Sequence, residues 1–172
     1  SLSRALHARP NDKKLRIRCI TLAGELGVVD QLIQLTRPFI SPVPGVEHID
    51  LYLAYINGLH QNGLYDAEIE LLDNLLNILS VNSEQFEEVL FYTARAYTKR
   101  GDTFFAEQII RRYLTESAEP AGRVIALLIE LLLKHGELNG AKAVEKEFGL
   151  FAETTNGGDP TYQEDPLPFI LA

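Results

Sequence analysis

Apolar residues recur at helical spacing along most of the chain, and short turn-like segments interrupt the pattern at regular intervals. The clearest stretch is residues 84–99, where apolar side chains lie three or four positions apart and share one face of a helix. These are Phe86, Val89, Leu90, Thr93, Ala94 and Tyr97. Ser83 precedes the stretch as a candidate N-cap. Residues 100–102 follow as a turn, and residues 103–115 then predict a second amphipathic helix.

The same layout occurs four times, with a glycine between the two apolar stripes each time. The glycines are Gly27, Gly63, Gly101 and Gly136, which are 36, 38 and 35 positions apart. A period near 34 is typical of helix–turn–helix arrays. Glycine at the end of a first helix supplies the left-handed conformation that other residues resist. Because one hairpin cannot bury its apolar faces alone, the sequence predicts an all-α fold of stacked hairpins.

A 34-residue repeat in which Gly101 is position 15 places Ala94, Tyr97, Ala106 and Ile110 at positions 8, 11, 20 and 24. These match the small, aromatic, small and bulky positions of the tetratricopeptide repeat (TPR) family, which residues 1–148 resemble in divergent form. The resemblance implies a right-handed α–α superhelix (solenoid) of about four TPR-like hairpins.

Two positions depart from the family pattern. Position 8 is isoleucine in three of the four units, and position 20 is Leu32 in the first unit and Glu68 in the second. Ala67 fits position 20 only after a slip of one residue, so the second hairpin is expected to be splayed or shifted. Another family of helical-hairpin repeats is the alternative.

The repeat frame also divides the chain. The predicted units are residues 13–46, 47–82, 83–119 and 120–148, with 1–12 as the end of a preceding repeat. Pro10 to Asp12 match the end of a repeat, so we expect a fragment of a longer protein; a short capping segment is the alternative.

Residues 149–172 contain glycines and prolines that exclude a continued helix. We expect a linker or frayed terminus there, or an apolar tip, 167–171, that occupies the array's groove.

The distribution of charge limits the classes of partner that we expect. The chain carries a net charge of −8, with six basic residues and one acidic residue in 1–18 and four acidic residues without a basic one in 149–172. Nucleic acid and anionic membranes repel an acidic chain, so neither is an expected partner. The sequence shows neither a signal peptide nor a transmembrane segment, which predicts a soluble chain.

The residues that carry chemistry in other proteins are dispersed here. The four histidines have no metal-ligand spacing, and no phosphate-binding glycine motif occurs. Cys19 lies on an apolar face, where a buried structural thiol is expected. Carboxylate pairs, among them Glu68 with Glu70, are interpreted as solvated helix surface. We therefore predict no enzymatic activity, no metal and no cofactor.

The TPR resemblance implies that the first helix of each unit lines a concave groove. The residues it selects as partner-binding are Ile17, Thr21, Leu53, Asn57, His60, Phe91, Arg95, Lys99, Glu130, Leu133 and Lys134. Leu53, Phe91 and Leu133 would anchor apolar groups of the partner, and Asn57, Arg95 and Lys99 would fix its orientation.

These features predict a non-enzymatic protein–protein interaction module that binds a peptide or helix of a partner within a larger assembly. Two alternatives remain: a structural solenoid segment that self-associates into a homo-oligomer, and a TPR-type chaperone for secreted substrates. The lysine–asparagine clamp with which some TPR proteins hold acidic chaperone tails is not matched in this sequence.

Overall fold

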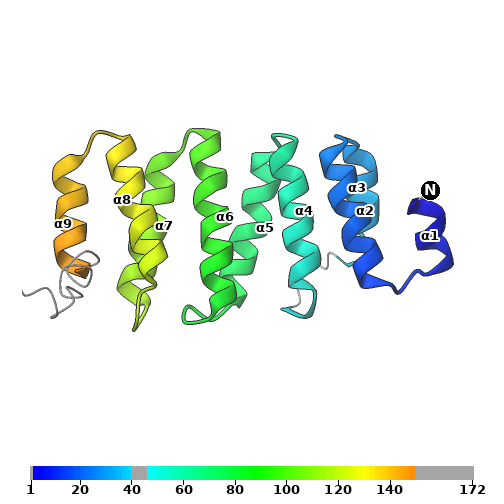
Figure 1. Cartoon of the computed structure of the whole chain (residues 1–172), viewed down its shortest axis with the longest axis horizontal. Helices are drawn as coiled ribbons and strands as arrows, with labels where there is room; N and C mark the ends of the chain where they lie inside the picture. Colours follow the sequence, from blue (N-terminus) through cyan, green and yellow to red (C-terminus); the bar gives the residue numbers. More distant parts are fainter. Residues whose placement is uncertain (1, 40–45, 150–172) are drawn as a thin grey trace, which may run out of the picture. The chain divides into compact units, whose positions relative to one another are not determined.

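The computed structural model describes residues 2–39 and 46–149, and within these ranges the chain is helical and contains no β-strand (Figure 1). The helices are α1 (Leu2–Ala8), α2 (Lys13–Glu25), α3 (Val29–Thr36), the 3₁₀ helix η1 (Val46–His48), α4 (Ile49–Gln61), α5 (Tyr65–Ile78), α6 (Glu84–Arg100), α7 (Thr103–Glu116), α8 (Gly122–Lys134) and α9 (Leu138–Phe148). The all-α prediction is confirmed for these residues. The predicted tail after Gly149 and the end of the first predicted repeat, including Pro44, lie outside them.

The sequence signals at the ends of α6 and α7 have the expected effect. The Ser83 side chain accepts a hydrogen bond from the Phe86 amide at 3.1 Å, so it caps α6 as predicted. Helices expected over 84–99 and 103–115 each extend one residue further. The apolar periodicity therefore located both helices of this hairpin.

The repeated glycines also occupy the predicted conformation. Gly27, Gly63, Gly101 and Gly136 follow α2, α4, α6 and α8 with φ of 70°, 71°, 95° and 76°. Among the described residues, only glycines have positive φ. The left-handed conformation that glycine permits is therefore used at these four turns and at Gly149, where α9 ends. The regular glycine spacing thus corresponds to a regular succession of helical hairpins.

Replacing Gly101 by alanine should lower the free energy of unfolding by about 1 kcal/mol, because a Cβ disfavours the left-handed conformation. A Cβ at this position meets nothing within 4 Å, so the effect is one of backbone conformation alone. Urea unfolding followed by circular dichroism measures the difference. An unchanged midpoint and slope would contradict the proposed role of this glycine.

The chain divides into two compact units, Ser1–Val124 and Ile125–Ala172, which are described in turn. In the first unit, α2 packs against α3 and α4. Helix α5 packs against α4 and α6, and α6 also packs against α7. The largest completely buried apolar side chains of this unit are Tyr52, Ile20, Leu32, Ile56, Leu59, Leu72, Leu75, Leu90 and Ile110. Within this unit, α2 and α3 therefore pack on α4, and α5 packs on α6, so that successive helical pairs are in contact.

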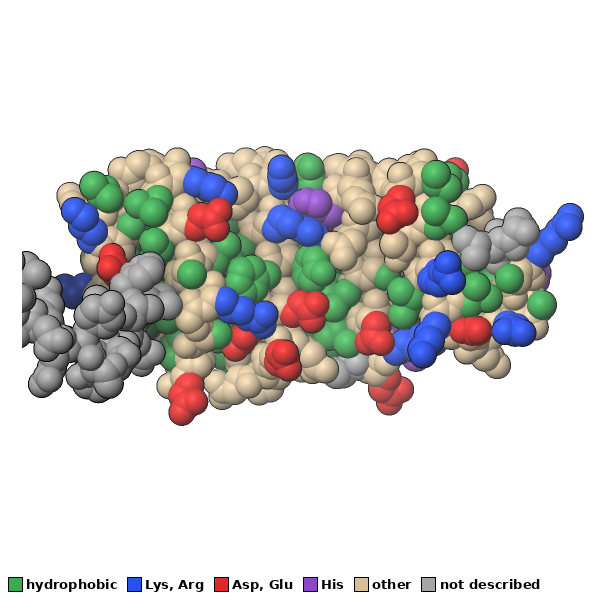
Figure 2. Space-filling model, in the orientation of Figure 1, with side chains coloured by type: hydrophobic (Ala, Val, Ile, Leu, Met, Phe, Trp, Pro, Cys, Tyr) green, Lys and Arg blue, Asp and Glu red, His purple; other side chains and the backbone are tan. Residues whose placement is uncertain are grey.

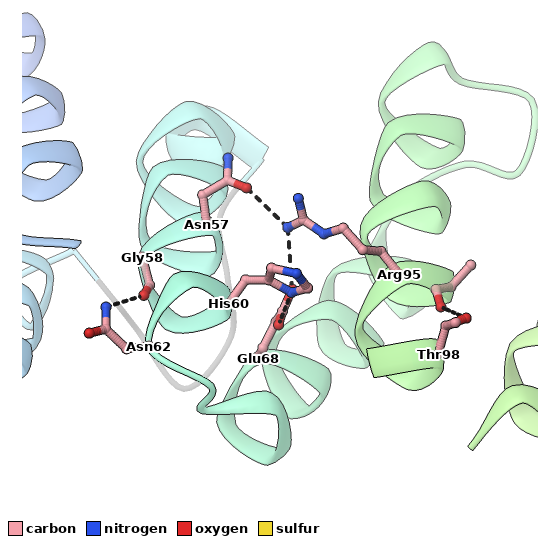
Figure 3. Close-up of polar contacts among 8 residues, drawn as sticks. Asn57, Gly58, His60, Asn62, Glu68, Arg95 and Thr98 are labelled. Carbon is pink, nitrogen blue, oxygen red and sulfur yellow. Dashed lines mark hydrogen bonds and ion pairs between the residues drawn. The ribbon is translucent and has the colours of Figure 1, made fainter. Parts of the chain in front are cut away.

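Two glycines allow α2 and α4 to approach closely. A Cβ built on Gly24 would lie 2.8 Å from the Gly58 Cα, and a Cβ on Gly58 would lie 2.8 Å from Leu32 Cδ1. The Asn62 amide donates to the carbonyls of both glycines, at 3.0 Å and 2.7 Å. The second bond is drawn in Figure 3. This contact fixes how the first two hairpins meet.

One sequence interpretation is wrong. Glu68 was expected on a solvated helix surface, but its side chain is completely buried in the first unit, whereas Ala67 is exposed. The slip that would place Ala67 inside therefore does not occur, and a carboxylate occupies the interior position. The reason is a set of polar partners on neighbouring helices, described below.

The second unit contains most of α8, the turn at Gly136 and α9. The amides of Gly136 and Glu137 donate to the carbonyls of Leu133 and Leu132 at 3.0 Å and 2.8 Å, which closes the turn. Leu128, Leu132, Ala141 and Val144 are buried in this unit. The helix predicted over 138–148 has these bounds in the structure.

Candidate partner-binding surface

Three of the residues selected from the sequence come together on α4 and α6 (Figure 3). Arg95 Nη2 donates a hydrogen bond to Asn57 Oδ1 at 3.0 Å, and it lies 3.5 Å from Glu68 Oε1. His60 Nδ1 lies 2.9 Å from Glu68 Oε2, with which it forms a hydrogen bond. The buried carboxylate on α5 thus joins His60 on α4 to Arg95 on α6, and Arg95 in turn binds Asn57 on α4. We call Asn57, His60, Glu68 and Arg95 the Glu68 network.

Glu68 is the buried centre of this network. Burial raises the pKa of its carboxyl group, while the hydrogen bond from His60 and the charge of Arg95 act in the opposite direction. A buried charge needs such partners, because leaving water without them is costly. The network therefore holds α4, α5 and α6 together through a group that requires all three helices.

Aromatic rings border the network on two sides. The Arg95 guanidinium lies 4.7 Å from the centre of the Tyr92 ring, and the Tyr92 hydroxyl accepts from Asn57 Nδ2 at 3.3 Å. On the other side the His60 ring meets Tyr65 edge to face at 5.4 Å. Arg95 Nε is buried without a hydrogen-bond partner. The guanidinium is thus held between the buried carboxylate and an aromatic face.

In the structure, Asn57, His60 and Arg95 form hydrogen bonds or ion pairs with other residues of the chain. The sequence interpretation assigned them only to binding a partner protein. Glu68 and Tyr92 were missed as members of the site. The available signal was Glu68 itself, a carboxylate at position 20 of its unit, where the repeat frame expects a small interior residue.

The other selected residues of the first unit differ in exposure. Ile17 and Leu53 are half-buried, and Ile17 packs on the core between α2 and α4. Phe91 is also half-buried, with the Arg123 guanidinium 5.4 Å from its ring centre. Thr21 and Lys99 are exposed. Apolar patches and charges of both signs alternate on the face shown in Figure 2.

The selected residues of the second unit line a common hollow on α8. Ala126, Ile129, Glu130, Leu133 and Lys134 surround a space of about 410 Å³. Leu133 is 50% exposed, and Lys134 pairs with Glu130 at 2.7 Å across one helical turn. Three residues that were selected from the sequence, Glu130, Leu133 and Lys134, therefore line the same hollow.

The described part of the chain was also searched for metal ligands, for a reactive thiol and for helices that could span a membrane. No group of three or more histidine, cysteine, aspartate or glutamate side chains there is placed to hold a metal ion. Cys19 is buried, as predicted, and burial raises the pKa of its thiol, which disfavours the reactive thiolate. None of the described helices combines the length and the hydrophobicity needed to span a bilayer.

Comparisons with protein-family models, with curated proteins and with solved structures yield no match to this chain. The interpretation of the surface therefore rests on its own residues and geometry.

Proposed function

We propose that the chain is a TPR-like protein-interaction module that binds a peptide or helical segment of a protein partner. In the first unit, binding uses the outward surface of α4 and α6. In the second unit, the α8 hollow is a separate binding surface. The apolar anchors are Leu53, Phe91 and Leu133.

The observation that carries the proposal is the direct bond between Arg95 and Asn57. These residues are 38 positions apart in sequence, about one repeat, and both were selected as groove positions. Their contact supports a shared surface formed by the first helices of successive hairpins. Surfaces of this kind, with a few apolar anchors among polar groups, suit extended or helical segments of other proteins.

The Glu68 network has a positioning role in this proposal. Its side chains bind one another within the unit, and the bond between Asn57 and Arg95 links α4 to α6, the helices that carry Leu53 and Phe91. A segment bound to the first unit gains its affinity from burial of apolar groups against these two residues, and a segment bound to the second unit from burial against Leu133.

The test is a selection from a displayed peptide library on the folded chain. Peptides that bind the wild type should bind the Phe91→Ala variant at least about thirtyfold more weakly, since truncating a binding hot spot costs about 2 kcal/mol or more. The Phe104→Ala variant is the matched control, since Phe104 is an aromatic residue on the second helix α7 and is 65% exposed. Circular dichroism establishes that both variants are folded. Equal binding by the two variants, or no selected peptide, would reject the proposal.

Self-association is a second candidate function. Leu133 and Leu138 in the second unit are 50% and 53% exposed, and large exposed apolar side chains that lie together mark interaction surfaces. Sedimentation velocity over a range of concentrations distinguishes a monomer from an oligomer.

A further inference from the structure

The second unit carries an apolar hollow between α8 and α9. Its floor is formed by Ile129, Leu133, Leu138 and Ala141, with Lys142 and Glu145 also lining it, around a space of about 390 Å³. We call this the α8–α9 hollow. It adjoins the hollow on α8 through Ile129 and Leu133, which line both.

The α8–α9 hollow exposes apolar side chains. Leu133 and Leu138 each leave about half of their surface to solvent. The free energy gained by covering apolar surface grows with the area covered, so covering these two half-exposed side chains favours docking. An apolar segment that fits between them would gain this energy.

The chain itself supplies such a segment a short distance after α9. Residues 167–171 read Leu-Pro-Phe-Ile-Leu, and Glu164 and Asp165 come just before them. Lys142 has no ion-pair partner among the described residues, whereas Lys134 is paired with Glu130. The apolar residues of this segment therefore match the floor of the hollow, and its acidic residues match Lys142 but not Glu145, which also lines the hollow.

The length of the connection is also suitable. Residues 150–166 connect α9 to the apolar segment, and a flexible chain of this length has an average span of about 20–25 Å. Leu138 and Gly149 are separated by α9, which is about 16 Å long. When a linker's average span resembles the distance to be bridged, the effective concentration of the tethered segment reaches the millimolar range.

We propose that residues 167–171 of the same chain dock in the α8–α9 hollow, with Phe169 and Ile170 on Leu133 and Leu138 and an acidic residue near Lys142. This occupancy does not rest on the proposed function. It would bring the C-terminal segment beside Leu133, which also lines the hollow on α8. The tether favours this occupant over a second copy at concentrations below the millimolar effective value.

Disulfide trapping in the full chain tests the docking. Cys19 is replaced by alanine, and cysteines are introduced as Glu145→Cys and Ala172→Cys. The matched control is Lys146→Cys with Ala172→Cys, since Lys146 is the next residue of α9, is exposed and does not line the hollow. Under a mild oxidant, the pair with Glu145→Cys should form an intrachain disulfide at least about fivefold faster, because docking raises the local concentration on one face of α9.

A second variant checks that the apolar segment causes the difference. Adding Phe169→Asp should reduce the rate at Glu145→Cys to that of the control, and circular dichroism shows whether the helices are intact. Equal rates at the two helix positions, or a rate that Phe169→Asp leaves unchanged, would overturn the proposal. Disulfide-linked dimers as the main product would assign the hollow to a second copy and overturn it as well.

Discussion

Replacing Gly24 by alanine is expected to lower the free energy of unfolding by about 2 kcal/mol. Inserting a methyl group into a packed contact costs about 1–3 kcal/mol, and the better helix propensity of alanine offsets about 1 kcal/mol. The upper part of this range applies, because the new Cβ would lie 2.8 Å from the Gly58 Cα. A backbone atom cannot rotate away as a side chain can, so α2 and α4 must separate.

The separation also affects Asn62, whose amide bridges the carbonyls of Gly24 and Gly58. Lengthening either bond weakens a partly buried hydrogen bond worth about 1 kcal/mol. A single methyl group at Gly24 therefore tests both the close approach of the two helices and the hydrogen bonds of Asn62.

Gly140→Ala is the matched control, since Gly140 is also a helical glycine. A Cβ there would have no neighbour closer than 3.5 Å, so the substitution should stabilise α9 by up to about 1 kcal/mol. Urea unfolding of both variants by circular dichroism provides the comparison. Destabilisation of the same size in both, or none in Gly24→Ala, would show that the close approach of α2 and α4 has no energetic role.

The helices and turns of this chain follow from local signals. Gly101 ends α6 because the left-handed conformation is favourable only for glycine, and Ser83 begins it because its side chain satisfies a backbone amide. Both effects act within a few residues, so the sequence contains all of the information. The all-helical structure was predictable for that reason.

The contacts between hairpins were less predictable. Gly24 and Gly58 lie inside helices, and the sequence does not distinguish a glycine that permits close approach from one that only weakens its helix. Their role depends on Leu32, which comes from the helix between them and fills the space beside Gly58. Such a contact follows from the packing of three helices and has no local signature.

The candidate site was predicted in part. The repeat frame selected Asn57, His60 and Arg95, and the structure brings them together. It did not identify their common partner, because a glutamate is ordinarily assigned to solvent. Glu68 is an exception that depends on polar partners from α4 and α6, and hence on how these helices pack.

Replacing Arg95 by alanine is therefore expected to lower the free energy of unfolding by about 2 kcal/mol at neutral pH. Removal of one partner of a buried ion pair costs 3–5 kcal/mol, and we expect about half of that because Arg95 is itself 37% exposed. The remaining Glu68 charge keeps only His60 as a partner. The comparison is Arg112→Ala, which removes an exposed pair with Glu116 and should change the stability little.

The cost of Arg95→Ala should depend on pH. Because the pKa of Glu68 is raised above its ordinary value of 4.5, the folded chain binds this proton more tightly than the unfolded chain does. The contribution of Glu68 to stability is therefore greatest below about pH 4.5 and declines as the pH rises through the raised folded pKa. Loss of Arg95 raises that pKa further, so the destabilisation should be largest at neutral pH and smaller near pH 4.

Glu68→Gln isolates the charge from the shape of the side chain. If the ionised carboxylate causes the penalty, the double variant with Arg95→Ala should be more stable at neutral pH than Arg95→Ala alone, and this gain should disappear near pH 4, where Glu68 is protonated. Urea unfolding of the four proteins at both pH values forms a double-mutant cycle. Additive effects that do not change with pH would show that Arg95 acts only through its packing on Tyr92. The polar network would then not be what holds α4, α5 and α6 together.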